Sequence, residues 1–218
     1  MKKAGERFLF WLVIMIILVG SLYGLYRAVS TPENIPLPNE LTEEDWIKGN
    51  PDADVVLIEY SDFQCPACSH FYEMVEDILD EFGNHILFAY RHFPLKTIHD
   101  KAVLASRATE AAGLQGKFWE MYAEIFENQT TWSILTVNAA ENHFIKYAAN
   151  LDLDQKQFIE DLNSKKVENI VEAEFQSALD GGLNSTPTFF LNGERIKNPK
   201  TLDEFRTLIR NAIEQTNT

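Results

Sequence analysis

The chain has few cysteines and few basic residues. Its 218 residues include 2 cysteines, and 19 lysines and arginines stand against 33 aspartates and glutamates. A structural zinc site built from thiolates takes four ligands, so two cysteines are too few for one. The net charge of −14 makes nucleic acid and anionic lipid surfaces poor partners, because both repel an acidic protein. Acidity of this kind keeps a protein soluble and selects no substrate.

Both cysteines lie in one short stretch, SDFQCPACSHF, over residues 61–71. Attachment of a c-type haem needs histidine directly after the second cysteine, but Ser69 stands there and His70 comes one place too late. A bridge between Cys65 and Cys68 closes a very short loop and so stabilises the fold little. The spacing therefore indicates a redox-active thiol pair. The remaining histidines show no metal-ligand spacing, and we predict neither a metal nor a cofactor.

The N-terminal region contains a long uncharged run. Residues 8–26, FLFWLVIMIILVGSLYGLY, are 19 in a row without a charge, close to the about 20 that a membrane-spanning helix needs. Basic residues dominate residues 1–7, which predicts a cytoplasmic N-terminus before a transmembrane anchor. A cleaved signal peptide with a small-residue site at 28–30 is the alternative, but the run exceeds the roughly 7–15 residues of a signal's apolar core. Either way, the rest of the chain is predicted to lie outside the cytoplasm.

A tether is predicted after this run. Residues 27–52 contain four prolines and show no sustained apolar period, which is typical of an extended linker. Within it, residues 41–47 resemble a short capped turn that packs on the folded domain. Packing of this last part on the domain is the alternative to a fully extended linker.

A strand, a helix and a second strand follow, over residues 53–97. Val55–Ile58 is a continuous apolar run of the kind that lies in a sheet covered on both faces. After Cys68, apolar residues recur at helical spacing until Gly83 supplies a stop signal. Ile86–Tyr90 has the composition of a second strand, so this part is predicted to be a β-α-β unit.

The second half of the chain is mostly helical in pattern. Residues 98–182 are predicted to form a helical insert. Residues 183–218 then complete the first part, with two short strands around the turn signal Asn192-Gly193 and a closing helix near residues 202–213. The order β-α-β, helices, β-β-α is that of an α/β thioredoxin fold with an inserted helical domain.

Three blocks of this sequence resemble the DsbA-like thiol:disulfide oxidoreductases in their membrane-anchored form. The blocks are VVLIEYSDFQCPAC, RHFPLKTIHDKAVLASRATEAAGLQGKFWEMYAEIF and STPTFFLNG. The similarity runs in order from about Leu41 to Ile213. A Cys-x-x-Cys pair after a buried strand, with Thr-Pro-Thr far downstream, is a specific combination. The resemblance implies a thioredoxin fold and disulfide exchange with other proteins.

The residue types around the cysteines suit thiolate chemistry. A thiolate is the attacking form, and the unpaired N–H groups of a helix N-terminus stabilise it. Cys65 is predicted to receive this help and to react first. Cys68, one turn further, is expected to lie deeper and to release a partner from the mixed disulfide. Pro66 fits the first helical turn, where its missing N–H costs nothing.

The resemblance also implies roles for Ala67 and Glu59. Ala67 stands where well-known members have histidine, and it can give a thiolate neither a hydrogen bond nor positive charge. We therefore expect a milder oxidant than those members. Glu59 matches a semi-buried acid that relays the proton of Cys68. Without the resemblance, Glu59 would be an ordinary strand-end carboxylate facing water.

The sequence Thr186-Pro187 resembles the family's cis-proline loop. Such a loop lies beside the cysteines and offers its backbone to an extended segment of substrate. A cis bond at Pro187 would place Thr186 against Cys65 and keep metal ions out of the site. The predicted site residues are therefore, for catalysis, Cys65, Cys68, Glu59 and Pro187, and, for substrate binding, Pro66, Ala67 and Thr186.

Together these features predict an anchored oxidoreductase that forms disulfides in reduced exported proteins. A quinone-linked membrane thiol oxidase of the DsbB or vitamin K epoxide reductase type is the expected partner that reoxidises it. The location favours oxidation, because disulfides persist outside the cytoplasm. Two alternatives stay open: a reductase or isomerase that is kept reduced, and a tethered chaperone or binding module whose cysteines are incidental.

Overall fold

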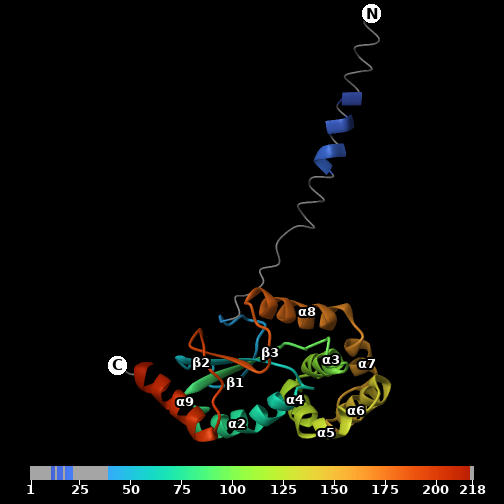
Figure 1. Cartoon of the computed structure of the whole chain (residues 1–218). Coiled ribbons are helices and arrows are strands. Elements are labelled where there is room, and N and C mark those ends of the chain that lie inside the picture. Colours follow the sequence, from blue (N-terminus) through green and yellow to red (C-terminus); the bar gives the residue numbers. More distant parts are fainter. Residues whose placement is uncertain (1–10, 13, 17, 22–38, 217–218) are drawn as a thin grey trace, which may run out of the picture. The chain divides into compact units, whose positions relative to one another are not determined.

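The computed structural model describes residues 11–12, 14–16, 18–21 and 39–216. These residues belong to two compact units, Met1–Ile35 and Pro36–Thr218 (Figure 1). The described residues of the first unit are helical. Among the described residues, no helix is both long and apolar enough to cross a membrane. The span predicted over 8–26 lies partly outside the described residues and stays a prediction.

A five-stranded mixed sheet forms the centre of the second unit. Its strands are, in chain order, β1 (Trp46–Gly49), β2 (Val55–Ser61), β3 (Ile86–His92), β4 (Thr188–Leu191) and β5 (Glu194–Arg195). Across the sheet the order is β1-β3-β2-β4-β5. Strands β2 and β3 run parallel, and the other neighbours are antiparallel. The predicted strand-helix-strand unit and the C-terminal hairpin are therefore parts of one sheet.

Helix α2 (Pro66–Phe82) connects the parallel strands β2 and β3. It begins directly after Cys65, with a proline in its first turn, and Gly83 caps its end. Its buried side chains recur at helical spacing and are Cys68, Phe71, Tyr72, Met74, Val75, Ile78, Leu79 and Phe82. The predicted β-α-β unit is confirmed, with both strands longer than predicted.

The helices α3 to α8 lie between β3 and β4 in the chain. They are α3 (Ala102–Gly113), α4 (Phe118–Glu127), α5 (Gln129–Trp132), α6 (Val137–Asn150), α7 (Gln155–Leu162) and α8 (Lys165–Asp180). The side-chain oxygens of Thr136, Asp154 and Ser164 accept hydrogen bonds from the first turns of α6, α7 and α8, which fixes where these helices begin. Helix α9 (Leu202–Thr216) closes the chain, as predicted.

Helices cover both faces of the sheet, with α2 and α9 on one face and α8 on the other (Figure 1). Side chains alternate along β2, so Leu57 packs in the core under α2, whereas Ile58 and Tyr60 pack in the core under α8. By the same alternation, Glu59 belongs to the face that α2 covers. An acidic side chain therefore lies under the helix that carries the cysteines.

Strand β1 lies in the region predicted to be a linker. It pairs antiparallel with β3, and Trp46 stacks on Phe118 with ring centroids 4.4 Å apart. The indole N–H of Trp46 also donates to Glu110 Oε1 at 2.8 Å. The linker predicted over 27–52 thus ends earlier than expected. Contacts with distant helices, rather than a local apolar pattern, hold this strand in place.

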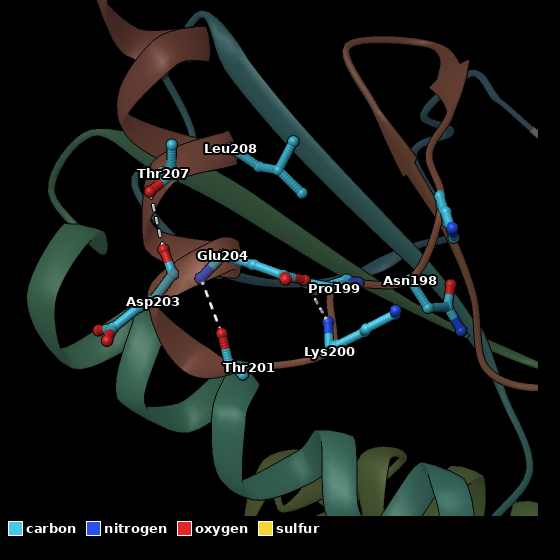
Figure 2. Close-up of a pocket in the computed structure, with 9 residues that line it drawn as sticks. Asn198, Pro199, Lys200, Thr201, Asp203, Glu204, Thr207 and Leu208 are labelled. Carbon is cyan, nitrogen blue, oxygen red and sulfur yellow. Dashed lines mark hydrogen bonds between the residues drawn. The ribbon is translucent and has the colours of Figure 1, made fainter.

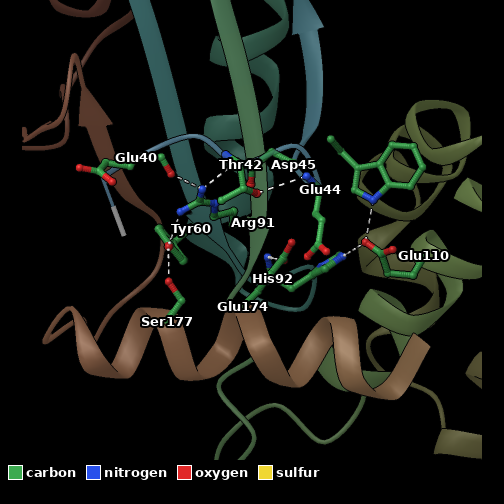
Figure 3. Close-up of polar contacts among 11 residues, drawn as sticks. Glu40, Thr42, Glu44, Asp45, Tyr60, Arg91, His92, Glu110, Glu174 and Ser177 are labelled. Carbon is green, nitrogen blue, oxygen red and sulfur yellow. Dashed lines mark hydrogen bonds and ion pairs between the residues drawn. The ribbon is translucent and has the colours of Figure 1, made fainter. Parts of the chain in front are cut away.

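A buried arginine fixes the segment before β1 (Figure 3). Arg91 on β3 donates to both carboxylate oxygens of Asp45, at 2.6 and 2.7 Å, and to the Tyr60 hydroxyl at 2.8 Å. It also donates to the backbone carbonyl of Glu40. The Tyr60 hydroxyl lies 3.0 Å from that of Ser177 on α8. The chain from Glu40 onward is therefore part of the folded unit, on the α8 side of the sheet.

Candidate active site

The two cysteines lie at the start of α2. Cys65 is the residue that caps this helix, with φ −72° and ψ 121°, and Pro66 is the first residue inside it. Cys65 is 8% exposed and Cys68 is 0% exposed. Both are free thiols in this structure. Cys65 is therefore the more exposed of the two cysteines.

Hydrogen-bond donors gather around the sulfur of Cys65. A hydrogen bond from the Cys68 thiol, with help from the Thr186 hydroxyl and the backbone N–H groups of Cys68 and Ala67, lowers the pKa of Cys65 to about 5 against the opposing effect of burial. The uncharged thiol donates instead to the Thr186 carbonyl at 3.7 Å. In that state the Thr186 hydroxyl has no partner among the described residues, so it is available to the thiolate. The site thus stabilises a thiolate at neutral pH.

The environment of Cys68 has the opposite effect. Burial, the hydrogen bond to Cys65 and the negative charges of Cys65 and Glu59 raise the pKa of Cys68 well above its ordinary value. The backbone N–H of Asp62 donates to the Cys68 sulfur at 3.4 Å. Cys68 therefore stays a thiol until a neighbouring base takes its proton.

Glu59 is the acid next to this buried thiol. It is 1% exposed, so the alternative of a strand-end carboxylate facing water is wrong. Burial raises the pKa of Glu59 to about 8, with a further increase from the charge of Cys65 and a partial decrease from Ser61. Its Oε2 atom has no hydrogen-bond partner in the described part of the chain. A carboxyl group that titrates near neutrality is suited to taking the proton of Cys68 and returning it.

The loop before β4 completes the site. The Thr186–Pro187 peptide bond is cis, as predicted. The carbonyl of Pro187 accepts a hydrogen bond from Asn198 Nδ2 at 2.8 Å. Asn198 also borders a surface hollow beside the start of α9, where the lining residues bond to one another (Figure 2). Asn198 thus connects the loop at the cysteines to the segment that precedes α9.

The structure brings the predicted catalytic residues together from three segments of the chain. Glu59 comes from β2, Cys65 and Cys68 from the start of α2, and Thr186 and Pro187 from the loop before β4. Side chains of the hydrophobic core under α2 hold these segments together. The geometry therefore offers one accessible thiolate, one buried thiol and one buried acid at a single place.

The predicted substrate-binding residues border this place. Pro66 and Ala67 are exposed beside Cys65, and Thr186 is half-buried. Their role in substrate binding stays a prediction. Within the described residues, no group of three or more histidine, cysteine, aspartate or glutamate side chains is placed to hold a metal ion.

Comparison with known proteins gives the family. The family model described as thioredoxin matches residues 41–211. The chain belongs to the thioredoxin family. Among solved structures it is similar to alpha-DsbA1 of Wolbachia pipientis, with a TM-score of 0.72 and 22% identity, over 82% of this chain and 96% of that one. It is also similar to oxidised BdbD of Bacillus subtilis, with a TM-score of 0.67 and 23% identity, over 77% and 92%. The predicted thioredoxin fold and the resemblance to DsbA-like proteins are confirmed at the level of the fold.

Curated relatives of this thioredoxin-family chain are longer proteins. The Na(+)/H(+) antiporter NhaA 1 of Mycobacterium sp. (strain KMS) is 37% identical over 195 residues, which are 86% of this chain and 30% of that protein. The Na(+)/H(+) antiporter NhaA of Herminiimonas arsenicoxydans is 39% identical over 156 residues, which are 71% and 23%. The chain thus spans less than a third of the length of these relatives.

Asp62 is a residue of this thioredoxin-family site that the sequence did not single out. It is fully buried. Its carboxylate accepts hydrogen bonds from the backbone N–H groups of Gln64 at 2.7 Å and Leu95 at 2.8 Å, and it lies 2.7 Å from His99 Nδ1. Asp62 thus ties the loop before Cys65 to the connection between β3 and α3. Asp62 lies in the sequence block that carries the cysteines, and this position could have pointed to its role.

Gln129 is the second such residue. It lies on the short helix α5 and is 6% exposed. Its Nε2 atom donates to the backbone carbonyls of Phe63 at 2.7 Å and Cys65 at 2.9 Å. No local pattern points to this role, because the contacted residues lie 66 and 64 positions away in the chain.

Proposed function

We propose that this chain is a membrane-anchored thiol:disulfide oxidoreductase that forms disulfides in exported proteins. The unequal thiol pair carries the proposal: the donors around accessible Cys65 lower its pKa to about 5, whereas burial raises the pKa of Cys68 well above its ordinary value. Such a pair reacts first at one defined sulfur. Membership of the thioredoxin family and the DsbA-like fold support disulfide exchange as the reaction.

The oxidation of a substrate starts from the Cys65–Cys68 disulfide. A substrate thiolate attacks Sγ of Cys65, so that a mixed disulfide forms and the bond to Cys68 breaks. The electron pair leaves on Cys68, which takes a proton from neutral Glu59. A second substrate thiolate then attacks the substrate sulfur of the mixed disulfide and releases Cys65 as a thiolate. The substrate has lost two electrons, and the cysteine pair has gained them.

The acidity of Cys65 favours this direction. A thiol of low pKa is a good leaving group, and a stable thiolate stabilises the reduced form of the pair. The pKa of about 5, set first by the hydrogen bond from Cys68, lies between the about 7 of thioredoxin and the about 3.5 of DsbA. We therefore expect a reduction potential between about −270 and about −120 mV. An intermediate potential also fits the milder oxidant expected from Ala67.

The surface around Cys65 is the proposed binding place of the substrate. Pro66 and Ala67 are exposed there. The Thr186 carbonyl accepts a hydrogen bond, at 3.7 Å, from Cys65 only when Cys65 is a neutral thiol. When Cys65 is in a disulfide, this carbonyl is available to a backbone N–H of an extended substrate segment. Binding through the backbone would suit an enzyme that acts on many sequences.

The anchor, the location and the redox partner are proposed from the sequence. The uncharged run over 8–26, with basic residues before it, supports a single membrane span and a cytoplasmic N-terminus. A domain outside the cytoplasm would meet exported proteins where disulfides persist. The reduced pair must pass two electrons to an acceptor, and we propose a quinone-linked membrane thiol oxidase of the DsbB or vitamin K epoxide reductase type.

The reduction potential of the cysteine pair tests this function. The full chain in detergent is equilibrated with glutathione buffers, and the thiol and disulfide forms are counted by mass after alkylation. A potential well above that of thioredoxin, toward about −120 mV, supports oxidation of substrates, whereas a value near about −270 mV supports the reductase alternative. The variant Cys65→Ser is the control. If it still suppresses aggregation while the wild-type chain exchanges no disulfides, the chaperone alternative holds.

A further inference from the structure

The loop that carries Cys65 is held by a side chain from the helical insert. The single nitrogen Nε2 of Gln129 donates to two backbone carbonyls of this loop, those of Phe63 at 2.7 Å and Cys65 at 2.9 Å. Because Gln129 is only 6% exposed, water competes little for these hydrogen bonds. Gln129 has no role in the disulfide exchange reaction described above.

The helix that carries Gln129 is itself firmly packed. Trp132 at the other end of α5 is 0% exposed, and its indole N–H donates to the carbonyl of Ile125 at 2.7 Å. The Trp132 ring packs against Phe144 of α6, with ring centroids 5.2 Å apart. The amide of Gln129 is therefore presented to the loop from a fixed point of the insert.

The two hydrogen bonds act on the electrostatics of the Cys65 sulfur. Backbone carbonyl oxygens carry negative partial charge, which opposes a thiolate nearby, and donors on these oxygens offset that effect. The Cys65 carbonyl also accepts from the N–H of Ser69 at 3.2 Å, within α2. Gln129 adds a donor from outside this helix. It also fixes the peptide plane that follows Cys65. This in turn fixes the positions of the backbone N–H donors further along α2.

We propose that Gln129 is a positioning residue of the redox site, through which the helical insert sets the reactivity of Cys65. This inference rests on the proposed function, because it concerns the same thiol. Without the two donated hydrogen bonds, the thiolate is less stable and the disulfide form of the pair is favoured. The insert would then control the chemistry of the cysteines and not only cover them.

Three variants separate this role from simple packing. Gln129→Met keeps the length of the side chain and removes both donated hydrogen bonds, and Gln129→Ala serves if the methionine disturbs folding. Gln115→Met is the matched control. Gln115 also makes two side-chain hydrogen bonds to backbone atoms, at 3.2 and 2.9 Å, but both go to Asp154 within the insert.

The rate of Cys65 alkylation is measured in the reduced full chain as a function of pH. We expect Gln129→Met to raise the pKa of Cys65 by about one unit, so that the midpoint of the alkylation profile moves up by about one pH unit. The equilibrium with glutathione should move about tenfold toward the disulfide, which is a potential about 30 mV lower. Gln115→Met should lose stability and keep the wild-type titration and potential.

The inference is overturned if folded Gln129 variants titrate and equilibrate as the wild-type protein does. It is also overturned if Gln115→Met shifts the titration equally, because the effect would then be a general loss of packing. Alkylation needs no redox partner, so this titration decides the role of Gln129 independently. A wild-type chain that exchanges no disulfides with glutathione would contradict the proposed function instead.

Discussion

Cys65 and Cys68 lie one helical turn apart, and their surroundings change their acidities in opposite directions. Cys65 faces donors that stabilise its thiolate, whereas Cys68 is buried beside Cys65 and Glu59, whose negative charges oppose a second thiolate. The mechanism depends on this difference. Cys65 is the more exposed of the two and the one whose pKa is lowered, so the proposed reaction forms the mixed disulfide there.

The variant Glu59→Gln tests the buried acid through the pH dependence of stability. Burial raises the pKa of Glu59 in the folded protein to about 8 from an ordinary 4.5. Between these values the unfolded chain has released this proton and the folded protein has not, so the folded protein loses stability as the pH rises. Glutamine does not titrate, so the variant does not lose this stability as the pH rises. Its unfolding free energy relative to wild type should therefore grow by about 4 to 5 kcal/mol from pH 4.5 to above pH 8.

Urea unfolding of the two reduced proteins across this pH range measures the difference. Parallel stability curves would contradict a titrating Glu59. The same variant should also slow oxidation of the dithiol at neutral pH by about 100-fold, because an amide cannot take the Cys68 proton. Glu160→Gln, at an exposed helix position, is the control for both measurements.

For single residues, the sequence predicted a role in the site where the residue lies in one of the three blocks that resemble DsbA-like proteins. Cys65, Cys68, Glu59 and Pro187 could all be placed in that way. Gln129 could not, because its contacts with the site are made only when the insert folds against the loop. Side-chain contacts across 64 or more positions leave no local pattern in the chain.

Among the elements, β1 directly follows a residue of a buried charge pair. The side chains of Arg91 and Asp45 are 1% and 3% exposed and lie 2.6 Å apart. Asp45→Ala leaves the Arg91 charge without its carboxylate, which should lower the unfolding free energy by about 3 to 5 kcal/mol. Glu160→Ala, which breaks the exposed pair with Lys156, should change it by less than about 1 kcal/mol.

Urea unfolding of both variants checks this prediction. The redox potential serves as a second measurement, since Arg91 lies on the sheet face opposite to α2. It should be unchanged in Asp45→Ala. A potential that moves with stability would show that the two faces of the sheet are coupled.

Elements with local signals could be predicted, and elements held by distant contacts could not. The β4–β5 hairpin was readable because Asn192 and Gly193 adopt positive φ angles of 49° and 81°, which this residue pair tolerates in a two-residue turn. Strand β1 and helix α5 are four residues each. Both are too short for periodicity: Trp46 of β1 packs on the distant helix α4, and Trp132 of α5 packs on the neighbouring helix α6.

For the whole molecule, the proposed anchor gives the clearest prediction. The full chain should sediment with membranes and stay there in high salt, because a protein with net charge −14 is not held by anionic lipid. A variant without residues 8–26 should leave the membrane fraction and keep the redox potential of the full chain. Comparing the intact mass of the protein in the membrane fraction with that in the soluble fraction is the check. A mature form that lacks residues 1–30 would support the signal-peptide alternative.

The order of the segments along the chain has a consequence for biosynthesis. Thr186 lies 121 residues after Cys65, with the helical insert between them. A chain that emerges N-terminus first presents its two cysteines long before the ribosome has made the loop that lies against them. During this interval the newly made thiols lack Thr186 and Gln129, and with them part of what acidifies Cys65. The Cys65 thiol of the nascent chain is therefore expected to have a higher pKa until Thr186 has been synthesised.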